Sequence, residues 1–337
     1  MKDGVPPVVR DAAERLSETL NFGTGWIATN LRRIGITATE GVEKVRTASA
    51  RAEDGLVESP RTQVVQRRTR ASNPDYRPSD AERAMAARRM TEQVEFTGDS
   101  RIQAANSSSD IRKMRSEGNE KEFSVYKPIH GERAKWGNET LLPFVYAPGA
   151  LTSREIAAYR IDEILGFGRV PTTARTAGII GPDGKPTGPG MIQQFVESGP
   201  ARPLDKYPLA QQQQVAVLDY ITGTFDRRPD NFRTVDRGDH LDLVAIDHGR
   251  SFPEAMNPLD VQINSPFVAL QRGETLQPEV LDALSAVNPD QLRAAIESAG
   301  NIHPNAVDGA MARFAEILNE GRIPVDAKLH PQIEFPE

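Results

Sequence analysis

The order of two hydrophobic periodicities along the chain most constrains its fold. Between residues 93 and 196, short segments alternate apolar and polar residues and end at turn residues, as strands do. From residue 209 onward, apolar residues recur mostly at helical spacing. Because strands come first and most helices later, the sequence predicts an α+β fold with two lobes. The expected strands are Gln93–Phe96, Glu122–Lys127, Val170–Ile180 and Gly190–Val196. The expected helices are Ser153–Leu165, Leu209–Thr222, Pro278–Val287, Pro289–Ala299 and Asn305–Leu318.

The first part of the chain follows a different pattern. Residues 1–50 indicate weakly amphipathic helix, residues 51–80 lose that periodicity and gain three prolines, and Ala81–Thr91 indicates a short helix. We therefore predict a helical or partly disordered N-terminal segment, with a linker that could dock a protein partner. The predicted organisation is residues 1–92 for this segment, 93–198 for the first lobe, 199–325 for the second lobe and 326–337 for a tail.

Composition excludes several classes of protein. The 337 residues contain no cysteine, so disulfides and thiolate metal sites are excluded. The net charge is −6, and the acidic excess lies after residue 95, so nucleic-acid binding is not expected. No apolar run approaches the length of a transmembrane helix, and the N-terminus lacks a signal-peptide pattern. We expect a soluble cytoplasmic protein, with export by a route without a classical signal peptide left open.

Three polar residues in the second half have the spacing of a phosphate-transfer site. Asp226 and Asn231 form an Asp-x4-Asn element, and a strand-like run sixteen residues later ends in Asp247-His248-Gly249. In kinases one carboxylate orients the acceptor hydroxyl, while an amide oxygen and a second carboxylate hold Mg²⁺ against the ATP phosphates. The same residues could instead form a polar turn around Pro229. The strand leading into Asp247 favours the functional interpretation.

The first half offers two matching parts. Lys127 stands at the end of an expected strand, where an ammonium group can reach nucleotide phosphates. Glu155 lies in the first turn of the expected helix Ser153–Leu165, where it can pair with that lysine. The alternatives are an exposed lysine and a capping box, Thr152-x-x-Glu155, at the start of the helix.

The segments Tyr126–Arg133, Arg154–Tyr159, Gly190–Val196 and Asp226–Gly249 resemble an actinobacterial kinase-like family that belongs with the phosphoinositide 3- and 4-kinases. The resemblance covers about residues 95–320. It implies a two-lobed fold like that of protein kinases and phosphoinositide kinases, with ATP and Mg²⁺, or Mn²⁺, as cofactors.

The resemblance also implies a role for each residue. Asp226 would be catalytic, and Asn231 and Asp247 would be the metal ligands. Lys127 would bind the phosphates with Glu155 as its partner. The remaining implied nucleotide-binding residues are Gln194, Phe195 and Val196 in the hinge, and Ser107 and Ser108 in the phosphate loop Asn106–Asp110.

Two positions depart from the phosphoinositide-kinase pattern. Arg228 stands where those kinases have a histidine, and His248 replaces the phenylalanine of the metal motif. The first departure concerns activation of the acceptor hydroxyl. The second means that a phenylalanine-based switch between active and inactive states is not expected here.

The sequence favours an active Mg²⁺- and ATP-dependent kinase whose acceptor is a protein, an inositol-lipid headgroup or a small molecule. A protein acceptor is slightly favoured, because the acidic catalytic part shows no basic or apolar membrane-docking segment. Three alternatives stay open: a pseudokinase acting through partners, an enzyme that transfers AMP, and a structural or delivery protein whose N-terminal ninety residues carry the function.

Overall fold

The computed structural model describes most of the residues between Ser72 and Glu337. The chain divides into two units, Met1–Ala71 and Ser72–Glu337. The described residues are 76–94, 109–133, 135–136, 139–140, 147–179, 187–255, 257 and 259–336. The predictions for residues 1–75 and for Ser107 and Ser108 fall outside these residues. Within them, no helix combines the length and apolar character needed to cross a membrane.

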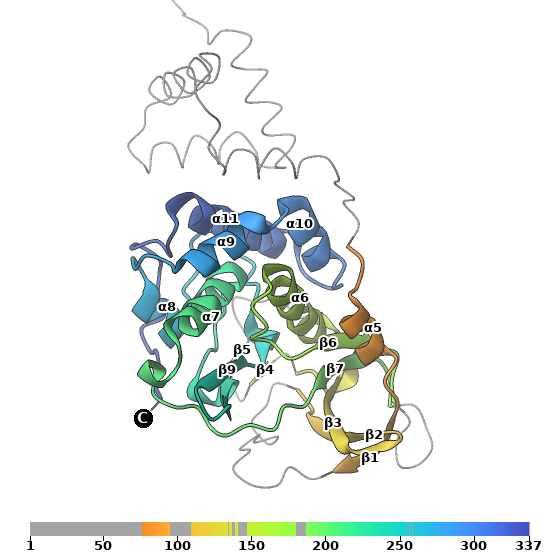
Figure 1. The fold of residues 1–337 in the computed structure, drawn as a ribbon. Helices are drawn as coiled ribbons and strands as arrows, with labels where there is room; N and C mark the ends of the chain where they lie inside the picture. The colour runs from red at the N-terminus through yellow and green to blue at the C-terminus, as the bar shows by residue number, and fades with distance from the viewer. Residues whose placement is uncertain are drawn as a thin grey trace, which may run out of the picture. The chain divides into compact units, whose positions relative to one another are not determined.

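A five-stranded antiparallel sheet forms the first lobe, in the order β1-β2-β3-β7-β6 (Figure 1). Its strands are β1 (Met90–Val94), β2 (Arg112–Ser116), β3 (Asn119–Pro128), β6 (Thr173–Thr176) and β7 (Gly190–Gln194). Gly190 is required where β7 meets β3, because a Cβ there would lie 2.4 Å from the backbone oxygen of Lys127. Two short strands, β4 (Lys135–Trp136) and β5 (Glu139–Thr140), pair separately.

The register of the sheet separates its two faces. Tyr126 is opposite Ile192, and both belong to a small apolar cluster with Met85 of helix α5 (Asp80–Ala86). Lys127 and Met191 are likewise opposite each other, and Met191 belongs to the main core. Successive side chains of a strand point to opposite faces, so Lys127 faces away from α5. We call the Lys127 side the cleft face.

Helix α6 (Ala150–Leu165) lies between the sheet and the remaining helices (Figure 1). It begins three residues earlier than expected, and Glu155 is therefore in its second turn. The capping box considered as the alternative role for Glu155 is not formed: Gly149 is the N-cap, in a left-handed conformation with φ 84°. The carboxylate of Glu132 takes over the capping role. It accepts hydrogen bonds from the N–H groups of Gly149 (2.9 Å) and Thr152 (2.8 Å).

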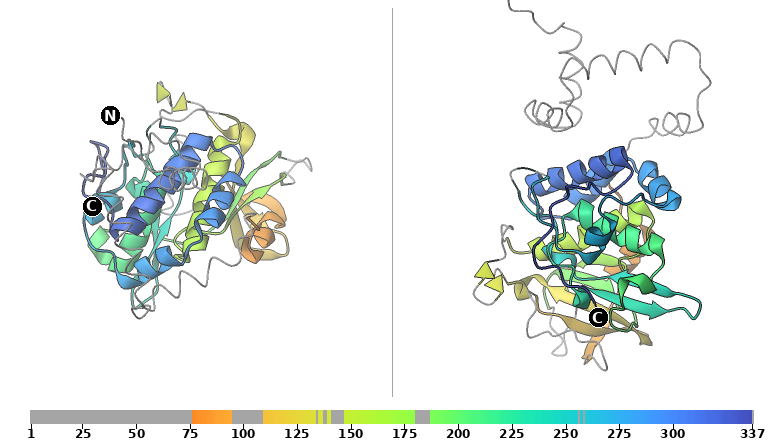
Figure 2. Two further views of the ribbon diagram at one scale, coloured as in Figure 1. Left: turned by 90° about the horizontal axis from the view of Figure 1, so that it is seen from above. Right: turned by 90° about the vertical axis from the view of Figure 1, so that its left-hand side faces the viewer.

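Helices form most of the second lobe. They are α7 (Leu209–Thr222), α8 (Pro266–Gln271), α9 (Pro278–Ala286), α10 (Pro289–Glu297) and α11 (Pro304–Glu320). The predicted helix Leu209–Thr222 is confirmed residue for residue. A two-stranded ribbon of β8 (Phe232–Asp236) and β9 (Leu241–Ala245) follows the Asp226 loop. In Figure 2, right, the blue C-terminal helices and the yellow and orange strands lie at opposite ends of this unit.

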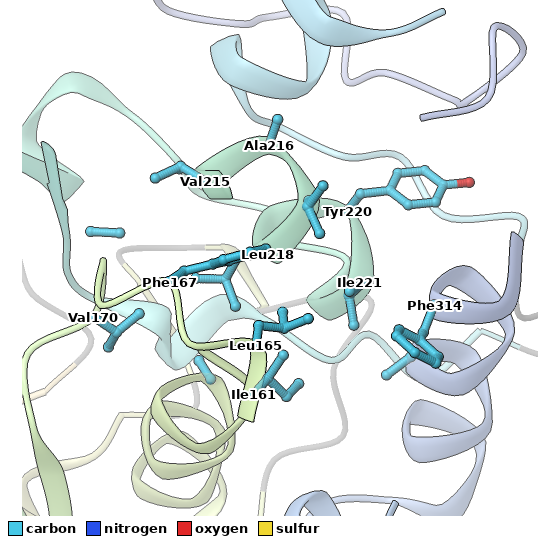
Figure 3. Packing of buried hydrophobic residues seen from close by; sticks show 14 of the residues in the cluster. Ile161, Leu165, Phe167, Val170, Val215, Ala216, Leu218, Tyr220, Ile221 and Phe314 are labelled. Carbon is cyan, nitrogen blue, oxygen red and sulfur yellow. The ribbon is translucent and has the colours of Figure 1, made fainter. Parts of the chain in front are cut away.

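The main core joins α6 to the second lobe. Ile161 and Leu165 of α6 and Phe167 after it face Leu218 and Ile221 of α7 (Figure 3). All five residues are buried, and burying such a side chain contributes about 1.5–3 kcal/mol. Because α6 also contacts β6 and β7, it fixes the two lobes against each other at the place where Lys127 meets Glu155.

Several strands differ from the sequence expectation. β2, β4, β5 and β8 were not predicted, β1 begins three residues before the expected strand Gln93–Phe96, and β6 covers only four of the residues expected between Val170 and Ile180. The predicted helix Ala81–Thr91 is partly wrong, since α5 ends at Ala86 and β1 begins at Met90. Helix α5 packs on the first lobe, ahead of the boundary predicted at residue 93. Glu82 on this helix forms a buried ion pair with Arg160 of α6, 2.6 Å apart.

Candidate active site

A buried lysine joins three segments of the chain that are distant in sequence. The Nζ atom of Lys127 on β3 lies 2.5 Å from Oε1 of Glu155 on α6 and 2.8 Å from Oδ1 of Asp247 after β9. The side chain of Lys127 is 8% exposed and that of Glu155 2%. The structure thus brings together three of the residues that the sequence singled out.

Local backbone geometry positions the two carboxylates. Asp247 has a left-handed conformation, with φ 58° and ψ 61°, which is uncommon outside glycine and typical of residues under a functional constraint. The next residue, His248, donates its backbone N–H to Oε2 of Glu155 at 2.9 Å. Glu155 is therefore hydrogen-bonded through both oxygens, one to the sheet and one to the Asp247 loop.

The charges of this group follow from its composition of one ammonium and two carboxylates. Burial alone would lower the pKa of Lys127, but Asp247 and Glu155 outweigh it and raise that pKa above its usual value. Burial would raise the pKa of Asp247, but the charge and hydrogen bond of Lys127 lower it to about 2. Burial raises the pKa of Glu155, and Lys127 offsets this only in part. The proton is on Lys127, and Asp247 is the firmly ionised carboxylate.

Asp226 lies in the loop after α7 and is flanked by two cations. Its Oδ1 accepts from Nε of Arg228 at 2.7 Å, and its Oδ2 is 3.5 Å from Nη1 of Arg250. Burial raises the pKa of Asp226, and the two guanidinium groups work against that increase. The side chain is 12% exposed. The departure noted at Arg228 thus has a direct structural consequence, because this arginine pairs with the predicted catalytic carboxylate.

The side-chain amide of Asn231 is oriented by one hydrogen bond. Its Nδ2 donates to the backbone oxygen of Asp226 at 2.5 Å, so its Oδ1 points away from that carbonyl. Mg²⁺ binds oxygen atoms and usually takes only one or two protein ligands, with substrate phosphates and water completing its shell. The amide oxygen of Asn231 and the ionised carboxylate of Asp247 fit this donor set.

Arg227 was not singled out by the sequence, yet it connects the two loops of the site. It is 1% exposed, and its Nη1 donates to the carbonyl oxygens of Asn231 (2.5 Å) and Ile246 (2.6 Å). Its charge is balanced by Asp219 of α7, which accepts at 3.0–3.2 Å. The signal in the sequence was Asp219 itself: a carboxylate inside the apolar run Val215–Ile221 requires a buried partner.

His248 belongs to this same support. Its ring is buried, and Nδ1 lies 3.0 Å from Nη2 of Arg227. Burial and the neighbouring Arg227 charge hold the pKa of His248 well below its usual value, so the ring is neutral near pH 7. A neutral imidazole can accept the hydrogen bond from Arg227. This position has a packing and hydrogen-bonding role in the structure.

The predicted hinge, Gln194–Val196, leaves the end of β7 and leads into the second lobe. The N–H of Gln194 donates to the carbonyl of Thr172 (2.9 Å), and that of Phe195 donates to the carbonyl of Phe123 (3.1 Å). These two N–H groups are engaged within the protein. An adenine base would therefore have to use the backbone of Val196 or the carbonyl groups of this segment.

The predicted phosphate loop is described only at its end. Ser107 and Ser108 lie outside the described residues. Asp110 donates its backbone N–H to the carbonyl of Gly131 at 3.1 Å and pairs with Arg112 on β2 at 2.7 Å. The loop thus leads directly into β2. The roles predicted for the two serines stay predictions.

Comparison with known proteins identifies part of the chain. Residues 182–273 match the family model of phosphatidylinositol 3- and 4-kinase. The chain is 29% identical over 181 residues to phosphatidylinositol 4-kinase gamma 4 of Oryza sativa subsp. japonica, covering 45% of this chain and 31% of the relative. It is 35% identical over 85 residues to protein Rv2133c of Mycobacterium tuberculosis, covering 25% of each. The chain thus spans less than a third of the length of these relatives.

Solved structures with a similar arrangement of the backbone include the Golgi casein kinase with Mn/ADP bound. That likeness has a TM-score of 0.47 and 16% identity over 75% of this chain and 79% of the other. The structure of hydra Fam20 with sugar has a TM-score of 0.49 and 16% sequence identity, and the match covers 79% of this chain and 95% of the other. The Rio2 kinase–ADP/Mg²⁺–phosphoaspartate complex of Chaetomium thermophilum has a TM-score of 0.34 and 15% sequence identity, and the match covers 69% of this chain and 73% of the other.

The matched residues 182–273 include the hinge, the Asp226 loop and the Asp247 loop. In the structure these meet a sheet and helix that supply Lys127 and Glu155. Residues 182–273 are therefore similar to the phosphatidylinositol 3- and 4-kinase family, and they lie within a two-lobed α+β fold.

Proposed function

We propose that the protein is a Mg²⁺- and ATP-dependent kinase that transfers the γ-phosphate to a hydroxyl group. The observation that carries this proposal is the buried ammonium of Lys127, held 2.5 Å from Glu155 and 2.8 Å from Asp247. A structural ion pair alone would not require the second carboxylate or the left-handed backbone of Asp247. Both are expected if Asp247 must face a metal while Lys127 faces phosphate.

Each residue then has a distinct task. Lys127 binds the α- and β-phosphates as a point charge, and Glu155 fixes its position. Asn231 and Asp247 would hold Mg²⁺, which would neutralise charge on the nucleotide phosphates. Arg227 keeps these two ligands at a constant separation, because it binds backbone carbonyls in both loops.

Asp226 orients the acceptor hydroxyl and takes up its proton. The acceptor oxygen forms a bond to the γ-phosphorus as the bond from that phosphorus to the β–γ bridging oxygen breaks, and ADP leaves. Burial raises the pKa of Asp226, and the charges of Arg250 and Arg228 oppose that rise, which favours the ionised form that accepts a hydrogen bond. On this scheme the acceptor enters beside Arg228, whose side chain is 35% exposed.

For the acceptor, a protein hydroxyl is slightly favoured over an inositol lipid or a small molecule. The residues after position 95 carry a net negative charge, which disfavours close approach to an anionic membrane surface. The name of the rice relative indicates a lipid acceptor for that protein. A shared fold does not fix the acceptor.

The test is thermal unfolding with ATP or ADP, each with and without Mg²⁺ or Mn²⁺. ATP at about 100 times its dissociation constant should stabilise the fold by roughly 2.7 kcal/mol, a rise of several degrees in Tm. The rise should require the metal and be lost in Asp247→Ala. The control is Asp260→Ala, which removes an exposed carboxylate that pairs with Lys328 on the surface. No shift with any nucleotide in folded wild-type protein would refute the proposal.

A further inference from the structure

The cleft face of the sheet carries a second buried cation that the proposed chemistry does not use. Lys113 on β2 has a side chain that is 9% exposed. Its Nζ lies 4.4 Å from the ring centroid of Phe123 and 3.9 Å from that of Phe195. The two rings meet edge to face, with centroids 6.3 Å apart. The ammonium group of Lys113 is thus positioned by two aromatic rings, one on β3 and one in the hinge after β7.

The register places Lys113 at the hinge end of the cleft. Lys113 is opposite Val125, and Val125 is opposite Gln193. This row lies on the same face as Lys127, two residues nearer the hinge, or roughly 7 Å along β3. If the phosphates lie at Lys127, the base lies towards the hinge, under the Lys113 row.

The opposite side of this region is also defined. On β8, Phe232 packs into the main core, so the next side chain, Arg233, points away from it. Arg233 reaches the segment just after the hinge, where its Nη2 donates to the carbonyl of Ser198 at 3.2 Å. Lys113 on the sheet, Phe195 in the hinge and Arg233 on the ribbon are thus the side chains that a base at the hinge would be expected to meet.

Among the described residues, the contacts of the Lys113 ammonium are the two phenylalanine rings and the carboxylate of Glu197. The two phenylalanine rings offer only their π faces. The carboxylate of Glu197 lies 3.8 Å away, beyond hydrogen-bonding distance, and its side chain is 79% exposed. A purine presents ring nitrogens that accept hydrogen bonds, and a bond from a charged donor is stronger than one from a neutral donor.

We propose that Lys113 recognises the nucleotide base, with its stem over the base and its ammonium donating to a purine ring nitrogen. This inference rests on the nucleotide site proposed above and adds a base-contacting side chain to it. It assigns Lys127 to the phosphates and Lys113 to the base. The two lysines should therefore respond differently to ligands with and without a base.

The experiment measures the affinity of Mg²⁺-ATP and of Mg²⁺-tripolyphosphate, which lacks base and ribose, by calorimetry. Lys113→Met keeps the apolar stem and removes the charge. It should weaken ATP binding about tenfold and leave tripolyphosphate binding unchanged, whereas Lys113→Arg should keep most of the ATP affinity. Lys206→Met, at an exposed lysine, is the matched control. Thermal unfolding without ligand verifies that each variant is folded.

The outcomes separate the two proposals. Suppose that wild-type protein binds ATP. The role of Lys113 is then refuted, while the kinase site stands, if the Lys113→Met variant binds ATP as tightly as wild type. It is refuted in the same way if the variant loses affinity for ATP and for tripolyphosphate to the same degree. If wild-type protein binds neither ligand, the proposed function fails and the base site fails with it. If Lys113→Met does not fold, Lys113→Gln decides, because it also removes the charge: a loss of ATP binding of about tenfold with unchanged tripolyphosphate binding supports a base contact, and no selective change refutes it.

Discussion

Arg227 and Asp219 form an ion pair with almost no solvent contact, 3.0 Å apart and exposed by 1% and 0%. The pair links helix α7 to the loop that begins one residue earlier with Asp226. Since Arg227 also binds carbonyls of both loops, one guanidinium joins the helix, the catalytic loop and the metal loop.

Breaking this pair should destabilise the protein strongly. Asp219→Asn leaves the buried Arg227 charge without a counter-ion, which typically costs about 3–5 kcal/mol. We expect Tm to fall by on the order of 10 °C. Arg237→Met removes an exposed partner of Asp242 and should cost less than about 1 kcal/mol. Urea unfolding of both variants measures the difference, and equal losses would contradict a special role for the buried pair.

Asp226→Asn should separate binding from turnover. The amide keeps the size of the side chain but cannot accept a proton, so turnover should fall about 10²-fold or more. Nucleotide affinity should change little, since Asp226 is not among the proposed phosphate or metal ligands. The assay is steady-state ADP release together with calorimetric ATP binding. Asp230→Asn, at an exposed position in the same loop, is the control and should keep full turnover.

Lys127→Met should weaken phosphate binding and the fold together. It leaves Glu155 and Asp247 without their shared cation, and the free energy of unfolding should fall by about 3 kcal/mol. Lys127→Arg should not restore ATP affinity, because a planar guanidinium cannot replace a compact ammonium between two carboxylates. Lys121→Met, on the exposed start of the same strand, should leave both properties unchanged. Full ATP affinity in Lys127→Met would remove this residue from the site.

The low pKa of Asp247, about 2, predicts an acid-dependent loss of stability. A carboxyl group with a folded pKa below its unfolded value of 3.8 stabilises the fold above about pH 4. That contribution decreases as the pH falls from about 4 towards 2. Asp247→Asn should therefore show a shallower decline of unfolding free energy between about pH 4 and about pH 2, measured by urea titration. A decline as steep as in wild type would assign the acid sensitivity to other carboxyl groups.

The candidate site residues with distinctive chemistry could be predicted from the sequence. The residues that hold the loops and the helix of the site in place could not. Lys127, Asp226 and Asp247 stand in motifs whose spacing reflects the reaction, together with a family resemblance. Arg227 has no motif meaning by itself, because its partners are mainly backbone carbonyls. Glu132 likewise caps α6 across a gap of seventeen residues, which no local pattern indicates.

The fold shows the same limit. Helix Leu209–Thr222 was predicted residue for residue because a long amphipathic run starts after Pro208 and ends before Gly223. Strand β2 was missed because Arg112–Ser116 contains one apolar residue, Met114. Its pairing with β3 comes from a tertiary context in which Lys113 is buried against aromatic rings.

Glu132 and Lys127 lie five residues apart, and both hold helix α6. Glu132 binds its first turn, and Lys127 binds Glu155 in the next. With two anchors on one short stretch, α6 cannot swing outward without losing its cap and an ion pair at once. Because α6 also packs into the main core with α7, the same helix ties the sheet to the second lobe. Lys127, Glu155 and Asp247 are therefore already in contact with one another, and we expect nucleotide binding to require little rearrangement of these three side chains.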